Sequence, residues 1–492
     1  MSGISEPLQL RIQSLRGSFI SSSGGQCVTA RAGRFIGAVF YRTSRLRPSR
    51  VTVLQYPARG LYISARLAAC VLGPILCAGA AHAQVASTIV DPFVPVDFDR
   101  GRNVGVAEQG DPNFQALGVR FGTFTAYPSI AVSSGVTNNV YLNNIDKVSD
   151  AVFTLQPGIR LRSGWSQNSI DIAASANVVR YAHETLRNRQ EYSVTAIGLL
   201  DISSNIQARA RIQYDRLAES PYANDLAANV SVLSQYARLV PNLAFIYTRG
   251  HTRLTASAEQ YTFRFNTIRF ADGTSRDQSE RDKTINRLAI QGDYAFTPSL
   301  AVYAQANADQ TNYKTLRSSG AANRDGDAVR FITGVSLDLA GLLRGRVGVG
   351  YVRRTYDSDL YKTAQGLSLE SDLAFFVTPL TTVTLAGQSS IQDANIGNSG
   401  AYRDNRLSLT ADHSLLRNLL ITAKALWSQR KILENASSNQ TVTQFTLNAK
   451  YQTNRFTSIG LGLGYGKGRS TGTSAGVPFD ELQGQVTLQV RL

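Results

Sequence analysis

Few residues of this chain could carry acid–base or metal chemistry once the first 83 positions are set aside. The histidines that remain are His183, His251 and His413. A catalytic nucleophile needs an imidazole beside a hydroxyl, and a metal site needs several ligands close together. These three histidines lie in separate segments, where a polar turn or loop position explains each of them. We therefore expect no catalytic residue, no metal ligand, no cofactor and no enzymatic activity.

Two glycine-rich stretches resemble phosphate-binding loops in amino-acid sequence. They read GRVGVG at Gly345–Gly350 and GLGLGYG at Gly460–Gly466. Such a motif holds phosphate only where it joins a strand to a helix, and no helical pattern follows either stretch. Glycine at alternate positions instead predicts close packing or tight curvature of a sheet.

The elements that must position any functional side chain follow a period of two. One segment reads SLAVYAQANAD from Ser299, and another reads QFTLNAKY from Gln444, with apolar residues at alternate positions. Successive side chains of a strand point to opposite faces of the sheet. Each segment is therefore predicted to be a strand with one apolar face and one polar face.

The segment TRLTASAEQYTFRF, which starts at Thr252, departs from strict alternation. We interpret this departure as a phase shift near Gln260. It would return Tyr261, Phe263 and Phe265 to the same apolar face as the aliphatic residues before them.

Alternating strands fit either a soluble sandwich or a membrane barrel, and two features favour the barrel. The strands run for about 10–12 residues, which is the length that crosses a bilayer at a tilt. Their polar face carries charged and amide side chains that suit a wet interior, while the 21 tyrosines and 20 phenylalanines tend to gather near strand ends. The predicted fold class is all-β, a transmembrane antiparallel up-and-down β-barrel.

Six charged residues on the polar faces are candidates for lining a pore. They are Arg253, Glu259, Asp309, Arg346, Lys424 and Lys450. Rings of charge inside a channel tune its preference among ions. The alternative, that they are solvated wall residues without a selective role, stays open.

Short turns alternate with long polar loops, such as Ala271–Lys283 and Asp393–Asn405. This arrangement is typical of bacterial barrels, which place short turns in the periplasm and long loops outside the cell. Counting nine outgoing and nine returning segments predicts about 18 strands, with 16 as the alternative. We place a periplasmic lead-in at 84–120 and the barrel at 121–492.

The first 83 residues differ from the rest and are interpreted as a leader. A basic flank ending at Arg66 precedes a short apolar run over 67–80, and small residues at Ala81 and Ala83 complete a secretory signal cleaved after Ala83. Residues 1–50 are interpreted as the product of a start placed too early. The leader holds all three cysteines, ten arginines and one acidic residue, which leaves 41 basic and 34 acidic residues and a formal net charge of +7. These charges are scattered, so we expect no nucleic-acid partner.

The segment from Arg100 to Ser166 resembles a second family of porin-type outer-membrane β-barrels, common in alphaproteobacteria and often found near exopolysaccharide genes. The residues that carry the resemblance are Asn113–Gly118, Gly122, Phe124, Pro128, Pro157-Gly158 and Trp165. Asn138-Asn139 departs from the more acidic pair of that family. The resemblance implies an outer-membrane location and, as a finer expectation, a link to surface polysaccharide export.

These observations predict a porin-like conduit in the outer membrane, for polysaccharide export or for diffusion of small solutes. The alternatives are an adhesive or structural protein that acts through its long loops, and an outer-membrane enzyme. Expected partners are outer-membrane lipid and lipopolysaccharide, the polysaccharide export components that the resemblance implies, and the outer-membrane assembly machinery. The final strand, Leu482–Leu492, resembles the signal read by that machinery, with leucine in place of the usual terminal aromatic residue.

Overall fold

The computed structural model describes residues 103–109, 111–222, 232–270, 272–394, 399–434, 439–472 and 477–492. All of them belong to one compact unit, Gly60–Leu492. The predicted leader, its apolar run and its cleavage site lie outside the described residues. Within the described ranges, no helix is both long enough and apolar enough to cross a membrane.

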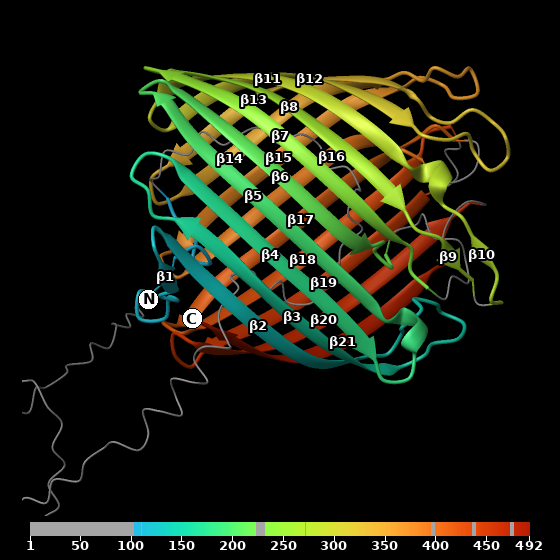
Figure 1. Ribbon diagram of the computed structural model, residues 1–492, viewed down its shortest axis with the longest axis horizontal. Helices are drawn as coiled ribbons and strands as arrows, with labels where there is room; N and C mark the ends of the chain where they lie inside the picture. Colours follow the sequence, from blue (N-terminus) through green and yellow to red (C-terminus); the bar gives the residue numbers. More distant parts are fainter. Residues whose placement is uncertain are drawn as a thin grey trace, which may run out of the picture. The chain divides into compact units, whose positions relative to one another are not determined.

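The described chain forms a closed antiparallel barrel of 18 strands (Figure 1). The barrel strands are β2 (Phe124–Thr137), β3 (Asp150–Ser163), β4 (Ser169–Tyr181), β5 (Arg189–Ser203), β6 (Ile206–Ala218), β7 (Gln235–Arg249), β8 (Thr252–Phe265), β11 (Lys283–Thr297), β12 (Leu300–Tyr313), β13 (Gly326–Leu339), β14 (Leu343–Arg354), β15 (Ala364–Thr378), β16 (Thr381–Asp393), β17 (Ala401–Leu416), β18 (Leu419–Ile432), β19 (Asn439–Gln452), β20 (Thr457–Thr471) and β21 (Phe479–Arg491). The predicted fold and the count of 18 are confirmed, and the alternative of 16 is wrong.

Each barrel strand pairs with the next along the chain, and β2 pairs with β21 to close the sheet. The closing register runs from Ser129 opposite Arg491 to Thr137 opposite Gln483. A short strand, β1 (Val119–Phe121), folds back on the start of β2. Between them Gly122 has a φ of +58°, a conformation that glycine adopts without strain.

Short turns join the strands at one end of the barrel, and longer loops join them at the other. We name these the short-turn end and the long-loop end; they correspond to the periplasmic and extracellular sides of bacterial barrels. The loops carry η1 (Thr185–Arg187), η2 (Ser279–Arg281) and the small hairpin of β9 (Ile268–Arg269) and β10 (Ser275–Arg276). In Figure 1 the C-terminus lies at the short-turn end, on the same side as β1.

The wall of the barrel is apolar outside and polar inside. On β11, the outward-facing side chains of Leu288 and Ile290 are 64% and 58% exposed. Gln291, which points to the inner face of the same strand, is 2% exposed. Exposed large hydrophobic residues recur at alternate positions on other strands, as at Val329 and Phe331 of β13 and at Leu367 and Leu369 of β15. This is the reverse of a water-soluble sandwich and fits a lipid-facing surface.

The expected phase shift in β8 is wrong. The pairing of β8 with β11 runs without a register shift from Thr252 to Phe263, so Tyr261, Phe263 and Phe265 face inward. They form a buried aromatic cluster with Tyr236, and the Arg281 guanidinium lies 4.1 Å from the centre of the Phe265 ring. These rings are buried by packing against β7 and β11, and Arg281, from the loop after β8, covers Phe265.

A segment before β1 covers part of the short-turn end. The Asn103 side chain donates hydrogen bonds to Asp338 Oδ1 at 2.6 Å and to the carbonyl of Leu339 at 3.0 Å. The backbone N–H of Val106 donates to Thr382 Oγ1 at 3.0 Å. The segment is thus fixed to β13 and β16, and Asn103 and Val106 are both buried.

The lipid-facing surface predicts how much a charged residue placed on it would destabilise the barrel. Ile290 lies near the middle of β11, so Ile290→Arg should lower the free energy of unfolding by about 2–4 kcal/mol, whereas the cost near an interface is about 0–1 kcal/mol. Phe296, which is exposed near the short-turn end of the same strand, provides the matched control as Phe296→Arg. Urea unfolding in lipid vesicles measures both, and equal losses at the two positions would contradict a membrane-spanning wall.

The segment before β1 should loosen in acid. Arg344 donates hydrogen bonds to both Glu108 carboxylate oxygens, at 2.9 and 3.0 Å, and these bonds hold the pKa of Glu108 below its ordinary value. Because the pKa of Glu108 is lowered in the docked segment, the ionised carboxylate contributes its full stabilisation of docking above the ordinary glutamate pKa of about 4.3. This contribution is lost as the pH falls through the lowered pKa. Hydrogen exchange of residues 103–109 should rise in that window, and Glu108→Gln should remove this dependence. A variant that keeps it would show that other groups control docking.

Candidate functional site

The structure places the six predicted pore-lining residues on the inward sides of their strands, and it brings Glu259 and Asp309 together. Glu259 and Asp309 both contact Arg287, at 3.7 Å and 2.7 Å. Arg346 lies on β14 and is 8% exposed, and Arg253 pairs in register with Asp293. Lys424 and Lys450 belong to β18 and β19, away from the others. That these six residues line a conducting path stays a prediction.

Arg287 belongs to a larger set of charged residues that fills one side of the interior. We call this set the ionic network, and it spans β8 and β11–β16. Its members are Glu259, Lys283, Arg287, Asp309, Arg330, Arg354, Glu370 and Asp393.

The middle of the ionic network is hydrogen-bonded around Arg330. Its guanidinium donates to Ser368 Oγ at 2.9 Å and to Glu370 Oε2 at 3.0 Å. The Tyr303 hydroxyl donates to the other oxygen of the same carboxylate at 2.8 Å. Ion pairs with this density of partners offset the cost of removing charge from water, so this side of the interior is a packed wall.

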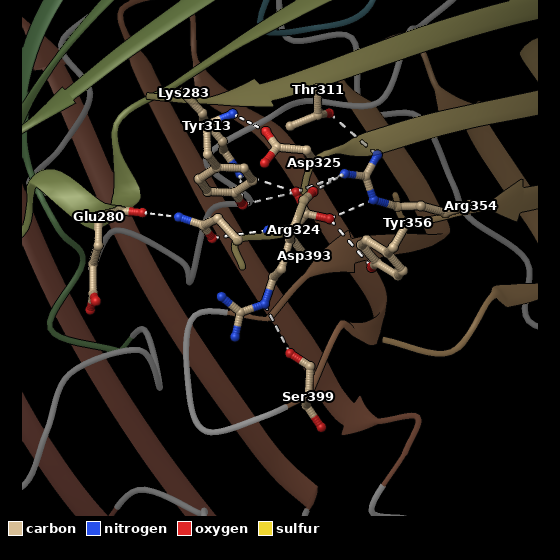
Figure 2. A network of polar contacts seen from close by, with 11 residues as sticks. Glu280, Lys283, Thr311, Tyr313, Arg324, Asp325, Arg354, Tyr356, Asp393 and Ser399 are labelled. Carbon is tan, nitrogen blue, oxygen red and sulfur yellow. Dashed lines mark hydrogen bonds and ion pairs between the residues drawn. The ribbon is translucent and has the colours of Figure 1, made fainter. Parts of the chain in front are cut away.

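Asp393 joins four strands at the long-loop end of the ionic network (Figure 2). Its carboxylate lies 2.5 Å from Arg354 Nε and 3.4 Å from Lys283 Nζ, and it accepts a hydrogen bond from the Tyr313 hydroxyl at 3.1 Å. The Tyr356 hydroxyl approaches the second oxygen at 3.5 Å. One buried carboxylate therefore holds β11, β12, β14 and β16 together.

The same cluster attaches the loops to the wall. Arg354 donates a hydrogen bond to the carbonyl of Arg324 at 3.3 Å, and Arg324 Nε donates to the carbonyl of Ser399 at 2.9 Å. Asn323 donates to the carbonyl of Glu280 at 2.7 Å, which ties η2 to the loop after β12. Figure 2 shows Arg324, Arg354 and Ser399 near Asp393 and near Lys283, the first residue of β11. The long-loop end is therefore covered on this side of the barrel.

The opposite side of the interior contains a cavity of about 350 Å³ bounded by β2–β5 and β19–β21, with Leu217 and the start of the loop after β6 also against it. We call it the neutral cavity, because most of its polar lining is uncharged. The uncharged polar residues include Ser129, Gln156, Asn177, Asn448, Gln483 and Gln485. None of the six predicted pore-lining residues borders it, whereas Asp309 borders a smaller cavity of about 70 Å³ in the ionic network.

The loop after β6 borders the neutral cavity at the long-loop end. Tyr222 from this loop packs against Phe479 of β21, with ring centres 5.7 Å apart, and donates a hydrogen bond to Glu481. Burial and the nearby Glu481 carboxylate raise the pKa of Tyr222 well above its ordinary value. Thr137 donates to the other Glu481 oxygen at 2.6 Å. The tyrosine thus remains neutral and fixes the loop across β21 and β2.

The two glycine-rich stretches lie within strands β14 and β20, as expected. On β14, a Cβ at Gly350 would come within 1.9 Å of the Phe331 carbonyl oxygen, so close packing explains that glycine. On β20, Gly462 and Gly464 border the neutral cavity. Amide side chains of β19 and β21 pack closely over these two glycines, as the alternate spacing predicted, because a Cβ at Gly464 would lie 2.7 Å from Gln483 Nε2.

The three histidines outside the leader remain apart in the structure. His183 Nδ1 lies 3.0 Å from Asp150 Oδ1 in a loop, and His413 Nδ1 lies 2.9 Å from Thr381 Oγ1. His251 is in the turn between β7 and β8. Among the described residues, no group of histidine, cysteine and carboxylate side chains could hold a metal ion.

Asp393 was expected in a loop, Asp393–Asn405, but it ends β16, and β17 begins at Ala401. Replacing it tests the ionic network. Asp393→Asn leaves Arg354 and Lys283 buried without their counter-charge, which typically costs about 3–5 kcal/mol. Urea unfolding followed by tryptophan fluorescence should report this loss, and Asp357→Asn, at an exposed carboxylate in the loop after β14, should change little. Equal stabilities of the two variants would show that Asp393 is not a structural centre.

No curated protein sequence matches the chain. The outer membrane protein OpdK from Pseudomonas aeruginosa is similar in structure, with 9% identity, a TM-score of 0.40, and 74% of this chain and 98% of that chain covered. OpdQ from the same organism shows 12% identity, a TM-score of 0.40, and 75% and 97% coverage. The family model described as "Putative beta-barrel porin 2" matches residues 111–492, and the chain belongs to that family.

Proposed function

We propose that this protein is a passive conduit for small hydrophilic solutes across the outer membrane. The observation that carries the proposal is the polar interior, which contains a cavity of about 350 Å³ beside a packed ionic network. An apolar exterior with a polar interior suits a water-filled path through lipid, and barrels of 16–18 strands are wide enough to enclose one.

Export of a surface polysaccharide is the finer function that the resemblance implies. A glycan chain in transit would have to pass the loop that Tyr222 fixes to Glu481, whereas a small solute needs less displacement there. The packed ionic network also restricts the cross-section that a polymer could use. We therefore place diffusion of small solutes first.

Reconstitution tests the conduit directly. Residues 84–492, folded and inserted into planar bilayers, should give stable single-channel currents in potassium chloride and should allow vesicles to swell in small sugars. A control variant lacking 272–277, an exposed stretch of the loop after β8, should conduct as well as the parent, because its residues lie outside the ionic network and the neutral cavity. A folded barrel that passes neither ions nor sugars would overturn the proposal.

The same deletion separates the conduit from an adhesin. A protein that acts through its loops would lose surface binding when residues 272–277 are removed. Its function would not depend on whether the barrel conducts. The deletion stops before Gln278, because Arg281 donates hydrogen bonds to Gln278 and Glu219 and keeps the loop attached. Loss of binding by a barrel that does not conduct would favour adhesion.

A further inference from the structure

We propose that solutes cross through the neutral cavity, along the glycine stripe of β20, and that this path selects uncharged, hydroxyl-rich solutes of the sugar class. This inference rests on the proposed conduit and adds its route and its substrate class. It is carried by the unequal division of the barrel interior between a packed charged side and an open uncharged side.

The charged side offers little room for a solute. Its interior residues are almost fully buried: Gln305 is 1% exposed, and Ile332 and Ser368 are 0% exposed. At the short-turn end it is covered by the segment around Asn103, which is bonded to Asp338. At the long-loop end it is covered by the loops that converge on Asp393. The ionic network therefore acts as a structural wall.

The open side exists because β20 lacks side chains where it faces inward. A Cβ at Gly464 would lie 2.7 Å from Gln483 Nε2, and one at Gly462 would lie 3.0 Å from Asn448 Oδ1. Glycine at these positions lets the amide side chains of β19 and β21 lie against the β20 backbone, so that they do not extend into the cavity. A larger residue would enter the cavity or displace those amides.

The lining of this cavity matches hydroxyl groups better than ions. An asparagine or glutamine amide both donates and accepts hydrogen bonds, as a sugar hydroxyl does. The hydroxyl oxygens of Ser129 and Thr446, which border the cavity, are buried and have no hydrogen-bond partner among the described residues. Ser129 itself is 6% exposed. These groups can form hydrogen bonds with a neutral polyol in place of those that it loses when it leaves water.

The charged residues that border the cavity already have partners. Glu191 accepts a hydrogen bond from Asn177 at 2.7 Å and lies 3.8 Å from Arg189. Glu481 is held by Thr137 and Tyr222. An ion in this cavity would lose hydration and gain no free counter-charge, whereas a neutral sugar would exchange one set of hydrogen bonds for another.

Three solutes with one ring size test the selectivity: glucose, glucuronate and glucosamine, each in vesicle swelling at pH 6, where the last two carry opposite charges. We expect both charged sugars to cross about tenfold more slowly than glucose, which corresponds to about 1.4 kcal/mol of uncompensated desolvation. Gln485→Glu keeps the shape of the side chain and adds a negative charge. It should slow glucuronate further and speed glucosamine.

Two glycine variants test the route. Gly464→Val should reduce the swelling rate in glucose, because the added side chain occupies the cavity. Gly198→Val is the matched control: it lies on β5 on the face opposite Glu191 and Ser193, and its Cβ would meet nothing within 4 Å. Heat-modifiable migration on gels shows that each variant has folded.

The outcomes separate the two proposals. If no solute enters vesicles that contain folded protein, the proposed conduit fails. If solutes enter but the three sugars cross equally fast, or a charged one crosses fastest, the selectivity is overturned while the conduit stands. If Gly464→Val folds and conducts like Gly198→Val, the route through the neutral cavity is wrong.

Discussion

The closed ladder of backbone hydrogen bonds is the constraint on which the rest of the structure depends. An unpaired N–H or C=O group in hydrocarbon costs several kcal/mol, so a sheet can cross a membrane only when it has no free edge. The pairing of β2 with β21 removes that edge. With the backbone satisfied within the wall, side chains are free to differ between its two faces, and this sequence places aliphatic groups outside and polar groups inside.

Much of this architecture is predictable because a barrel strand leaves a strong local signal. Alternation at 299–309 identified β12 with its correct inward face, including Asp309, and the short turns located the strand starts to within a few residues. Family membership agrees with the resemblance seen at 100–166. These features depend on near neighbours in the chain, so a single sequence is enough to reveal them.

The interior was harder to predict because its contacts join distant strands. Tyr261 and Phe263 look like membrane-facing aromatics until their packing with Tyr236 of β7 and Ile285 of β11 is known. Asp393 resembles any polar loop residue, and only the meeting of β11, β12, β14 and β16 makes it a centre of the ionic network. The six charged candidates were chosen by sign and face, which cannot distinguish a packed wall from the border of an open space.

The neutral cavity is built from the two ends of the barrel sequence, and this affects when it can form. Ser133 and Thr487 lie 354 positions apart, yet their hydroxyl oxygens are 2.8 Å apart across the closing seam. Contacts between such distant residues form late and slowly in folding. The barrel strands of the ionic network, β8 and β11–β16, each pair with a sequence neighbour, so their ladders close shorter stretches of chain. A polypeptide truncated before Phe479 would lack β21, so the edges of β2 and β20 would stay unpaired and neither the closed wall nor the passage beside it could form.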